Sequence, residues 1–331
     1  RIKQAVLGGA KLIVLDPRNT ELARMADVHI PLRPGSNVAV INALQHELLS
    51  GGHLDADFIE RCAEGLDDVV DLDRLGAFVT KSATPGHRSG NPLPRIAETP
   101  SGMLNSIGLP SKGVDDFLAK IVPFYSRFAP PLIASVSADT IAQFEFMAAA
   151  VSVPGGSAIE ANISCPNIEE DGRAFAMHPD VTEQVIGRMR ASTDRPIWAK
   201  LTPNTGDIAE VACAAEAAGA EAVVVANTIL GIAIDAETRR PLLGSVTGGL
   251  SGPAIRPIIL RMVYQCARSI SIPIIASGGI ETAEHVIEFM LAGATAAQVG
   301  TASFIHPIAM VTVIDGLIEY CERHEITHVA E

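Results

Sequence analysis

Cys165 is the residue of this sequence whose type and position could support acid–base or nucleophilic chemistry. It lies in the stretch EANISCPNIEEDG, directly after an apolar run at 158–164 and before a polar loop. A free cysteine is most often a small buried apolar residue, but one just past a strand end can be partly exposed and act as a base or nucleophile. Position alone leaves both interpretations open. The other four cysteines lie in helical patterns, which favours a buried role: Cys62, Cys213, Cys266 and Cys321.

Two lysines and several glycine-rich turns indicate an anionic ligand. Lys81 and Lys200 end apolar runs, where a charged side chain is unfavourable unless an anion pairs with it. The stretches SGGIETA (277–283) and VGTASF (299–304) place glycines between an apolar run and a helical pattern. Such turns either need a positive φ or hold a phosphate on backbone N–H groups, and the pattern favours phosphate. GGLSGPAIRP, at 248–257, is a further loop of this kind.

These residues must be positioned by a parallel sheet, because apolar runs alternate with helical patterns from residue 76 onward. Continuous apolar runs are typical of strands buried on both faces. Seven strands are predicted, at 76–81, 131–136, 158–164, 196–202, 220–228, 272–279 and 296–301. Helices are predicted between them at 139–150, 180–191, 207–218, 253–269 and 282–292. The carboxyl ends of such strands meet at one face, which carries the active site in α/β barrels.

The strand count is one short of a closed (β/α)8 barrel, which needs eight. Residues 1–67 have a different pattern and read as one compact α/β unit with a single long strand, KLIVLD at 11–16. We therefore expect two units, 1–67 and 68–331. Either one strand is missing, or it comes from the first 70 residues, where 11–16 is the candidate, or the sheet is open.

The composition argues against nucleic-acid and membrane partners. The 331 residues carry a net charge of −13 without a cluster of Lys and Arg, which disfavours a phosphate-backbone partner. No apolar run approaches the ~20 residues that span a bilayer. Five scattered cysteines without a C-x-x-C pair fit a reducing cytoplasm. The chain opens on Arg1 without a leader pattern, so we expect that natural residues are missing at its front.

A short pattern at the carboxyl end imitates a metal site. HEITH, at 324–328, matches the H-E-x-x-H arrangement of zinc proteases. Only three residues follow it, so no downstream third ligand exists in this sequence. We interpret it as part of a solvated terminal helix and expect no metal.

The region from about residue 69 to the end resembles the catalytic subunit of class 1 dihydroorotate dehydrogenases, and most of all the 1B subfamily. The resemblance covers about 260 residues. Its motifs are VDLDRLGAFVTKSATPGHRSGNPLPRIAETPSGMLNSIGL, NISCPN, AKLTPN, ANTILGIAIDAETRRPLLGSVTGGLSGPAIRP, SGGIETAEH and VGTASF. It implies an FMN-binding TIM barrel that oxidises dihydroorotate to orotate in pyrimidine (UMP) biosynthesis, a flavin-dependent oxidation of a CH–CH bond.

The resemblance also assigns residues. Cys165 is implied as the base that removes the C5 proton while FMN accepts the C6 hydride. Substrate binding is implied for Lys81, Asn105, Ser106, Ile107, Gly108, Leu109, Asn162, Asn227 and Thr228. FMN binding is implied for Lys81, Ser82, Asn162, Lys200, Gly252, Gly278, Gly279, Gly300 and Thr301. Ser135 stands where the family often has an asparagine near the flavin.

The 1B likeness implies a protein partner. Electrons are expected to leave through an iron–sulfur flavoprotein subunit, carrying FAD and a [2Fe–2S] cluster, toward NAD, in a homodimer or heterotetramer. The cysteines of this chain lack cluster spacing. Two alternatives stay open, a flavoenzyme like dihydropyrimidine dehydrogenase and a fusion product with impaired catalysis.

Residues 1–67 resemble instead a fragment of the molybdopterin oxidoreductase family, which includes formate dehydrogenase. The motif is GAKLIVLDPRNTELARMADVHIPLRPGSNVAVINAL. The family's dinucleotide-binding loops would correspond to Asp16, Arg18, Thr20, Arg33 and Gly35. The stretch stands where the dehydrogenase family has about thirty further residues and its first barrel strand. The sequence therefore predicts a fusion joined near EGLDDVVDLDR, with that strand missing.

Overall fold

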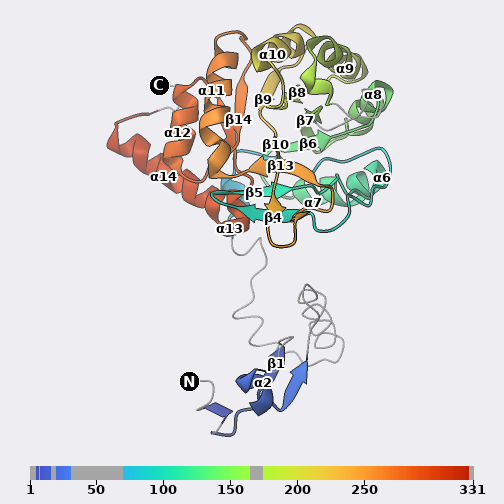
Figure 1. Ribbon diagram of the computed structural model, residues 1–331. Helices are drawn as coiled ribbons and strands as arrows, with labels where there is room; N and C mark the ends of the chain where they lie inside the picture. The colour runs from blue at the N-terminus through green and yellow to red at the C-terminus, as the bar shows by residue number, and fades with distance from the viewer. Residues whose placement is uncertain (1–4, 7, 16–19, 31–69, 165–173, 328–331) are drawn as a thin grey trace. The chain divides into compact units, whose positions relative to one another are not determined.

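The computed structural model describes residues 5–6, 8–15, 20–30, 70–164 and 174–327. The chain divides into two compact units, Arg1–Leu66 and Asp67–Glu331. Figure 1 draws both units as ribbons. The predicted relationship of the first unit to molybdopterin enzymes stays a prediction.

The first unit contains a small parallel sheet. Strand β1 (Ile13–Leu15) pairs in parallel with β2 (Val28–Ile30), and helix α2 (Glu21–Met25) connects them. The Thr20 side chain caps α2 by accepting the Ala23 N–H at 3.2 Å. Within the first unit β1 pairs with β2, and the hypothesis that 11–16 supply the eighth barrel strand stays a hypothesis. Asp16, Arg18, Arg33 and Gly35 lie outside the described residues.

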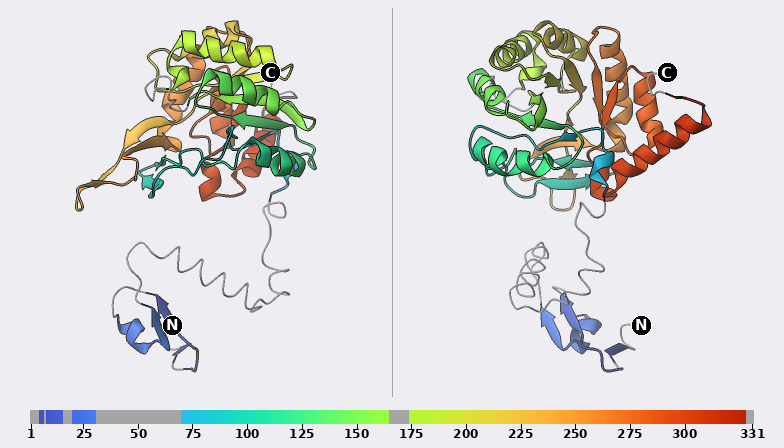
Figure 2. Two further views of the ribbon diagram at one scale, coloured as in Figure 1. Left: turned by 90° about the vertical axis from the view of Figure 1, so that its right-hand side faces the viewer. Right: turned by 180° about the vertical axis from the view of Figure 1, so that it is seen from behind.

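The second unit is built on a curled parallel sheet of seven strands, in the order β15-β14-β9-β8-β7-β6-β3 (Figures 1 and 2). The strands are β3 (Phe78–Val79), β6 (Leu132–Val136), β7 (Gly156–Asn162), β8 (Ile197–Lys200), β9 (Ala222–Val225), β14 (Ile274–Ser277) and β15 (Ala296–Gln298). Each coincides with one of the seven predicted runs. The predicted barrel architecture with seven strands is thereby confirmed, and β3 and β15 are the ends of the sheet as described.

Helices cover the outer face of the sheet, as the right-hand view of Figure 2 shows. They are α8 (Ile141–Ala150), α9 (Pro179–Ser192), α10 (Ile208–Ala217), α11 (Arg256–Ala267) and α12 (Ala283–Leu291). Three begin at capping side chains, because Thr140, Asp207 and Thr282 each accept a backbone N–H of the first turn. Helices outside and side chains inside bury both faces of the sheet, so every residue of β6 and β9 is buried.

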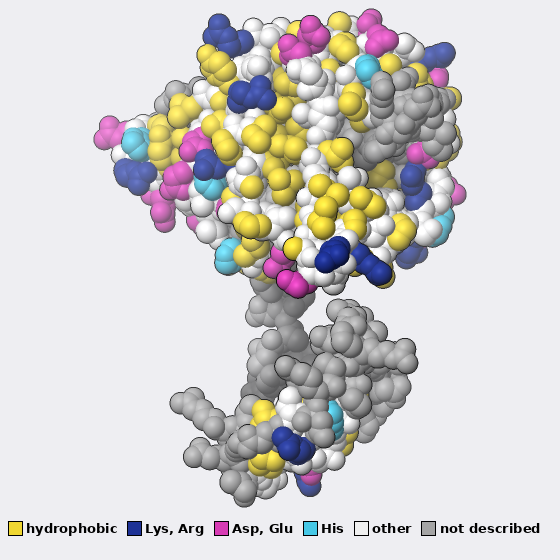
Figure 3. Space-filling view, in the orientation of Figure 1, with side chains coloured by type: hydrophobic (Ala, Val, Ile, Leu, Met, Phe, Trp, Pro, Cys, Tyr) yellow, Lys and Arg dark blue, Asp and Glu magenta, His cyan; other side chains and the backbone are white. Residues whose placement is uncertain are grey.

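A second sheet was not predicted. Strands β4 (Ile96–Thr99), β5 (Gly102–Asn105), β10 (Ile229–Ile232) and β13 (Thr247–Ser251) form an antiparallel sheet in the order β10-β13-β5-β4. The interpretation of 248–257 as one loop is therefore wrong, since β13 covers its first residues. A hairpin of β11 (Ile234–Asp235) and β12 (Arg240–Pro241) extends from this sheet in the left view of Figure 2. Figure 3 shows apolar side chains gathered over this sheet. Leu230 on β10 and Ile96 on β4 are exposed.

Further helices complete the unit. They are η1 (Leu72–Arg74), α6 (Val114–Asp116), η2 (Phe117–Ile121), α7 (Val122–Tyr125), η3 (Phe175–Met177), η4 (Pro253–Ile255), α13 (Ala302–Ile305) and α14 (Ala309–Arg323). Helix α14 ends before His324, so the prediction that HEITH lies in a helix is wrong for the residues described there. In the described ranges, no helix has the length and apolar character to cross a membrane.

Candidate functional site

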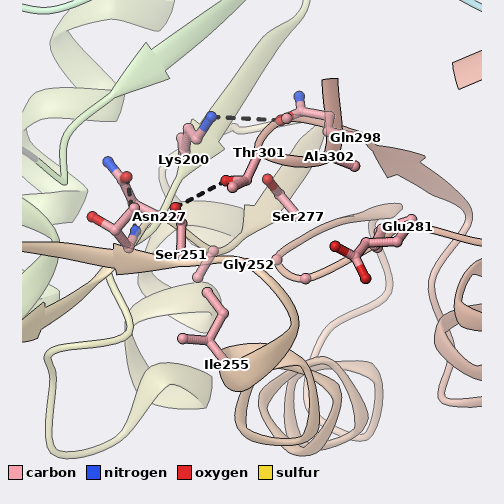
Figure 4. Close-up of a pocket in the computed structure, with 16 residues that line it drawn as sticks. Lys200, Asn227, Ser251, Gly252, Ile255, Ser277, Glu281, Gln298, Thr301 and Ala302 are labelled. Atoms are coloured by element: carbon pink, nitrogen blue, oxygen red, sulfur yellow. Dashed lines mark hydrogen bonds between the residues drawn. The ribbon is translucent and has the colours of Figure 1, made fainter. Parts of the chain in front are cut away.

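A pocket lies at the carboxyl ends of the parallel strands. Its walls come from the residues that follow β8, β9, β14 and β15, together with the turn between β13 and η4. Figure 4 shows Lys200, Asn227, Gln298 and Thr301 around it. Eight of the predicted site residues line this pocket: Lys200, Asn227, Thr228, Gly252, Gly278, Gly279, Gly300 and Thr301. Strand ends that are far apart in sequence therefore meet where the parallel topology predicts.

Three of the pocket glycines are required by the backbone itself. Gly252 and Gly279 have φ values of +97° and +71°, and Gly278 has +154°. A Cβ on Gly279 would lie 2.8 Å from Gly252 O, and one on Gly252 would lie 2.9 Å from Gly102 Cα. The two turns thus approach each other too closely for a side chain. Tight turns alone therefore explain why glycine occurs at 252, 278 and 279. They leave the prediction of a bound phosphate open.

Gly300 is different. A Cβ there would meet no atom within 4 Å, and its φ lies outside the left-handed region. The residue nevertheless lines the pocket. The local backbone does not need a glycine at this position, and a side chain there would extend into open space at the pocket.

Hydroxyl groups stand beside these glycines. Thr301 Oγ1 donates to Ser251 Oγ at 2.9 Å, and Ser251 Oγ donates to Met103 O at 3.4 Å. Ser277 also lines the pocket. Hydroxyls and glycine backbone N–H groups form a donor set suited to a phosphate monoester.

A polar network connects β3, β7 and β9 next to the pocket. Asn162 Nδ2 donates to Ser82 Oγ at 3.0 Å, and Ser164 Oγ donates to Asn162 Oδ1 at 2.6 Å. Asn227 Nδ2 donates to Asn162 Oδ1 at 3.4 Å and also to Ser164 Oγ. Asn227 Oδ1 accepts the Thr228 N–H at 2.8 Å. The predicted residues Ser82, Asn162 and Asn227 therefore form one connected group.

Cys165 follows this network directly in sequence, but it lies outside the described residues. Ser164, the residue before it, bonds to both Asn162 and Asn227. Since Asn227 lines the pocket, the chain leaves β7 toward 165 beside the pocket wall. Lys81 follows β3 and is not among the residues that line the pocket.

The predicted substrate loop at 105–109 is partly strand. Asn105 ends β5, and its Nδ2 donates to Gly249 O on β13 at 3.3 Å. Ser106 Oγ accepts from Asn91 Nδ2 at 2.7 Å, and Ile107 O accepts the Asn91 N–H at 3.1 Å. Gly108 and Leu109 have positive φ values of 76° and 49°. These residues do not line the pocket described above; through β13 they are tied to the strand that carries Ser251.

Glu160 and Gln298 are site residues that the sequence did not predict, whereas Ser135, which the resemblance placed near the flavin, contacts Glu160. Glu160 is 1% exposed in the middle of β7. It accepts from Ser135 Oγ at 3.0 Å, from Lys200 Nζ at 3.4 Å and from Gln298 Nε2 at 2.8 Å. The signal that could have found it is a carboxylate inside an otherwise apolar run, which requires buried partners. Among the described residues, no group of His, Cys, Asp and Glu could hold a metal ion.

The family model for dihydroorotate dehydrogenase matches residues 54–321. The catalytic subunit of dihydroorotate dehydrogenase B (NAD(+)) from Trichlorobacter lovleyi is 46% identical over 268 residues, which cover 81% of this chain and 88% of that protein. The same subunit from Porphyromonas gingivalis is 46% identical over 265 residues, covering 80% and 86%. The crystal structure of dihydroorotate dehydrogenase from Eimeria tenella, in complex with ferulenol, matches with a TM-score of 0.63 at 22% identity. The match covers 75% of this chain and 76% of the Eimeria tenella chain, which shows that the two share a fold.

Proposed function

The chain belongs to the dihydroorotate dehydrogenase family, and on that premise we propose that it oxidises dihydroorotate to orotate in pyrimidine biosynthesis with a bound flavin. The observation that carries the proposal is the pocket at the strand ends, which unites eight residues predicted to bind flavin or substrate. Its placement at the carboxyl face of a curled parallel sheet is where such folds bind their ligands.

We propose FMN as the flavin, because the donor set fits its phosphate. Gly278, Gly279, Gly300 and Thr301 would hold the phosphate, and Gly300 leaves open space at that place. Lys200 lines the same pocket and would donate to the flavin ring system. When bound, the flavin supplies the acceptor for the hydride that leaves C6 of dihydroorotate.

The side chains of this protein bind the substrate and move its proton. We assign removal of the C5 proton to the thiolate of Cys165. Asn162 and Asn227 would hold the substrate, together with Thr228, Lys81 and residues 105–109. The bond between Asn162 and Asn227, and their shared contact with Ser164, fixes the orientation of both amides before a ligand arrives. Preorganised donors lower the barrier because they need no rearrangement during the reaction.

A separate subunit would accept the electrons. The curated relatives carry the name of a catalytic subunit of an NAD(+)-dependent enzyme. We propose that this chain likewise works in the cytoplasm with an iron–sulfur flavoprotein partner, which carries FAD and a [2Fe–2S] cluster and passes electrons to NAD. A homodimer or heterotetramer is the expected assembly.

The first unit is proposed to be a fragment similar to molybdopterin oxidoreductases. Among its predicted cofactor residues, Thr20 is described, and its hydroxyl caps helix α2. Molybdenum analysis of the purified chain tests whether the fragment retains a cofactor.

The activity is tested by following orotate formation from dihydroorotate with an artificial electron acceptor. We expect turnover with dihydroorotate and little with dihydrouracil, which lacks the carboxylate. Preference for dihydrouracil would favour the dihydropyrimidine dehydrogenase alternative, and no turnover of either substrate by flavin-loaded protein would contradict the proposal.

A further inference from the structure

Glu160 is a carboxylate buried in the interior of the curled sheet, with 1% of its side chain exposed. Its two oxygens have separate partners. Oε1 accepts from Ser135 Oγ at 3.0 Å and from Lys200 Nζ at 3.4 Å, and Oε2 accepts from Gln298 Nε2 at 2.8 Å. A buried carboxylate is unfavourable without such partners. Glu160 does not line the pocket, so its effect on a ligand must pass through another residue.

Lys200 is that residue. It lines the pocket, and its Nζ lies 3.4 Å from Glu160 Oε1. Figure 4 shows its other contact, with Gln298 Oε1 at 3.5 Å. An ammonium has three N–H donors. Two are directed to Glu160 and Gln298, which leaves one for a bound ligand.

The three residues meet because the sheet curls. Glu160 is on β7, Lys200 on β8 and Gln298 on β15. In the sheet order, β14, β9 and β8 lie between β15 and β7. The bond between Gln298 and Glu160 therefore crosses the inside of the curled sheet rather than following a neighbouring strand. Glu160 and Gln298 thus hold the Lys200 ammonium from two sides.

We propose that Glu160 and Gln298 are positioning residues, which hold the Lys200 ammonium at the pocket wall and set the positive charge that a bound flavin meets. The inference rests on the proposed flavin site. A reduced flavin carries additional negative charge, so a nearby cation favours the reduced form. The Glu160 carboxylate offsets the charge of Lys200 and thereby keeps the reduction potential lower than an unpaired lysine would.

The test uses three variants of the full chain: Glu160→Gln, Gln298→Glu, and the double variant. In Glu160→Gln one carboxylate oxygen is replaced by an NH2 donor, which cannot accept from Lys200 Nζ, and the carboxylate charge is lost. The double variant exchanges the two groups and places Lys200 again between a carboxylate and an amide. Each protein is loaded with FMN, and its midpoint potential is measured with dithionite as reductant. This readout does not require activity with dihydroorotate.

We expect Glu160→Gln to raise the midpoint potential and to slow flavin reduction by dihydroorotate on the order of 10- to 100-fold, as is common when a residue that orients a site ligand is removed. The double variant should restore both properties in large part. Glu221→Gln is the matched control, because Glu221 pairs with Arg190 at 2.7 Å and does not line the pocket. It should leave the potential unchanged.

A midpoint potential of Glu160→Gln equal to or below that of the unmodified chain would overturn the proposal. If Glu160→Gln does not fold, a double variant that folds but keeps an altered potential overturns the proposal as well, because the exchanged carboxylate and amide would then fail to restore the charge environment of Lys200. Failure of the proposed function looks different: the unmodified chain would bind no FMN, or its bound FMN would not be reduced by dihydroorotate.

Discussion

At the scale of single residues, the proposed reaction depends on Cys165 as the base. Replacing it by serine should slow flavin reduction by dihydroorotate at neutral pH by about 10²- to 10⁴-fold, the usual contribution of a positioned base. Serine is a far weaker base than cysteine, so the rate of Cys165→Ser should rise as pH is raised. Stopped-flow measurements at several pH values check this. Loss of bound flavin in Cys165→Ser, with a normal rate in the molecules that retain it, would instead assign the residue a packing role.

Gly300 allows a test of phosphate binding without damage to the fold. Gly300→Ala places a methyl group in open space at the pocket. It should raise the dissociation constant of FMN about tenfold, which corresponds to ~1.4 kcal/mol, and leave the Tm of the flavin-free protein equal or slightly higher, since alanine restricts the unfolded chain. Gly187→Ala in α9 is the control, because a Cβ there also meets no atom within 4 Å. An unchanged FMN affinity in Gly300→Ala would remove the argument for phosphate at this turn.

At the scale of elements, the seven strands could be predicted because their residues are uniformly apolar, as in β6, where all five are buried. The antiparallel sheet of β10, β13, β5 and β4 could not be predicted in this way. β5 and β13 contain glycines with low strand propensity, and they are strands because they pair with each other, Asn105 opposite Gly249. The pocket glycines follow from local patterns, whereas Gln298 and Glu160 are 138 residues apart. Only the curled sheet brings those two together.

Helix α11 provides a prediction about pH. Its buried face includes Cys266, and burial, with smaller effects of Cys213 and Asp207, raises the pKa of the Cys266 thiol from 9.0 to about 12. The folded state therefore holds this proton more tightly than the unfolded state. The stabilising contribution is complete below pH 9 and is lost as pH rises from 9 toward 12. The difference in unfolding free energy between the unmodified chain and Cys266→Ala should accordingly narrow above pH 9.

Urea unfolding at pH 8 and at pH 10 measures that difference. Cys213→Ala is the control, since Cys213 is exposed. In the native protein at pH 8, a thiol reagent should modify Cys213 and leave Cys266 unmodified until the chain unfolds. Rapid modification of Cys266 in the folded protein would contradict its placement in the core.

At the scale of the whole molecule, the two units should be separable in function. All residues that line the pocket belong to the unit Asp67–Glu331. Removal of residues 1–66 should therefore leave FMN content per chain and the rate of flavin reduction within about twofold, which is below 0.5 kcal/mol. Flavin spectra and stopped-flow rates of the shortened chain check this. A shortened chain that folds but binds no FMN would show that the first unit contributes to the site.

Anaerobic addition of dihydroorotate to the full chain loaded with FMN tests the proposed reaction most directly. We expect one flavin per chain, loss of the visible absorption band of oxidised flavin on addition of substrate, and one orotate formed per flavin reduced. A fully loaded protein whose flavin spectrum does not change with dihydroorotate, although dithionite reduces it, would contradict the proposed reaction.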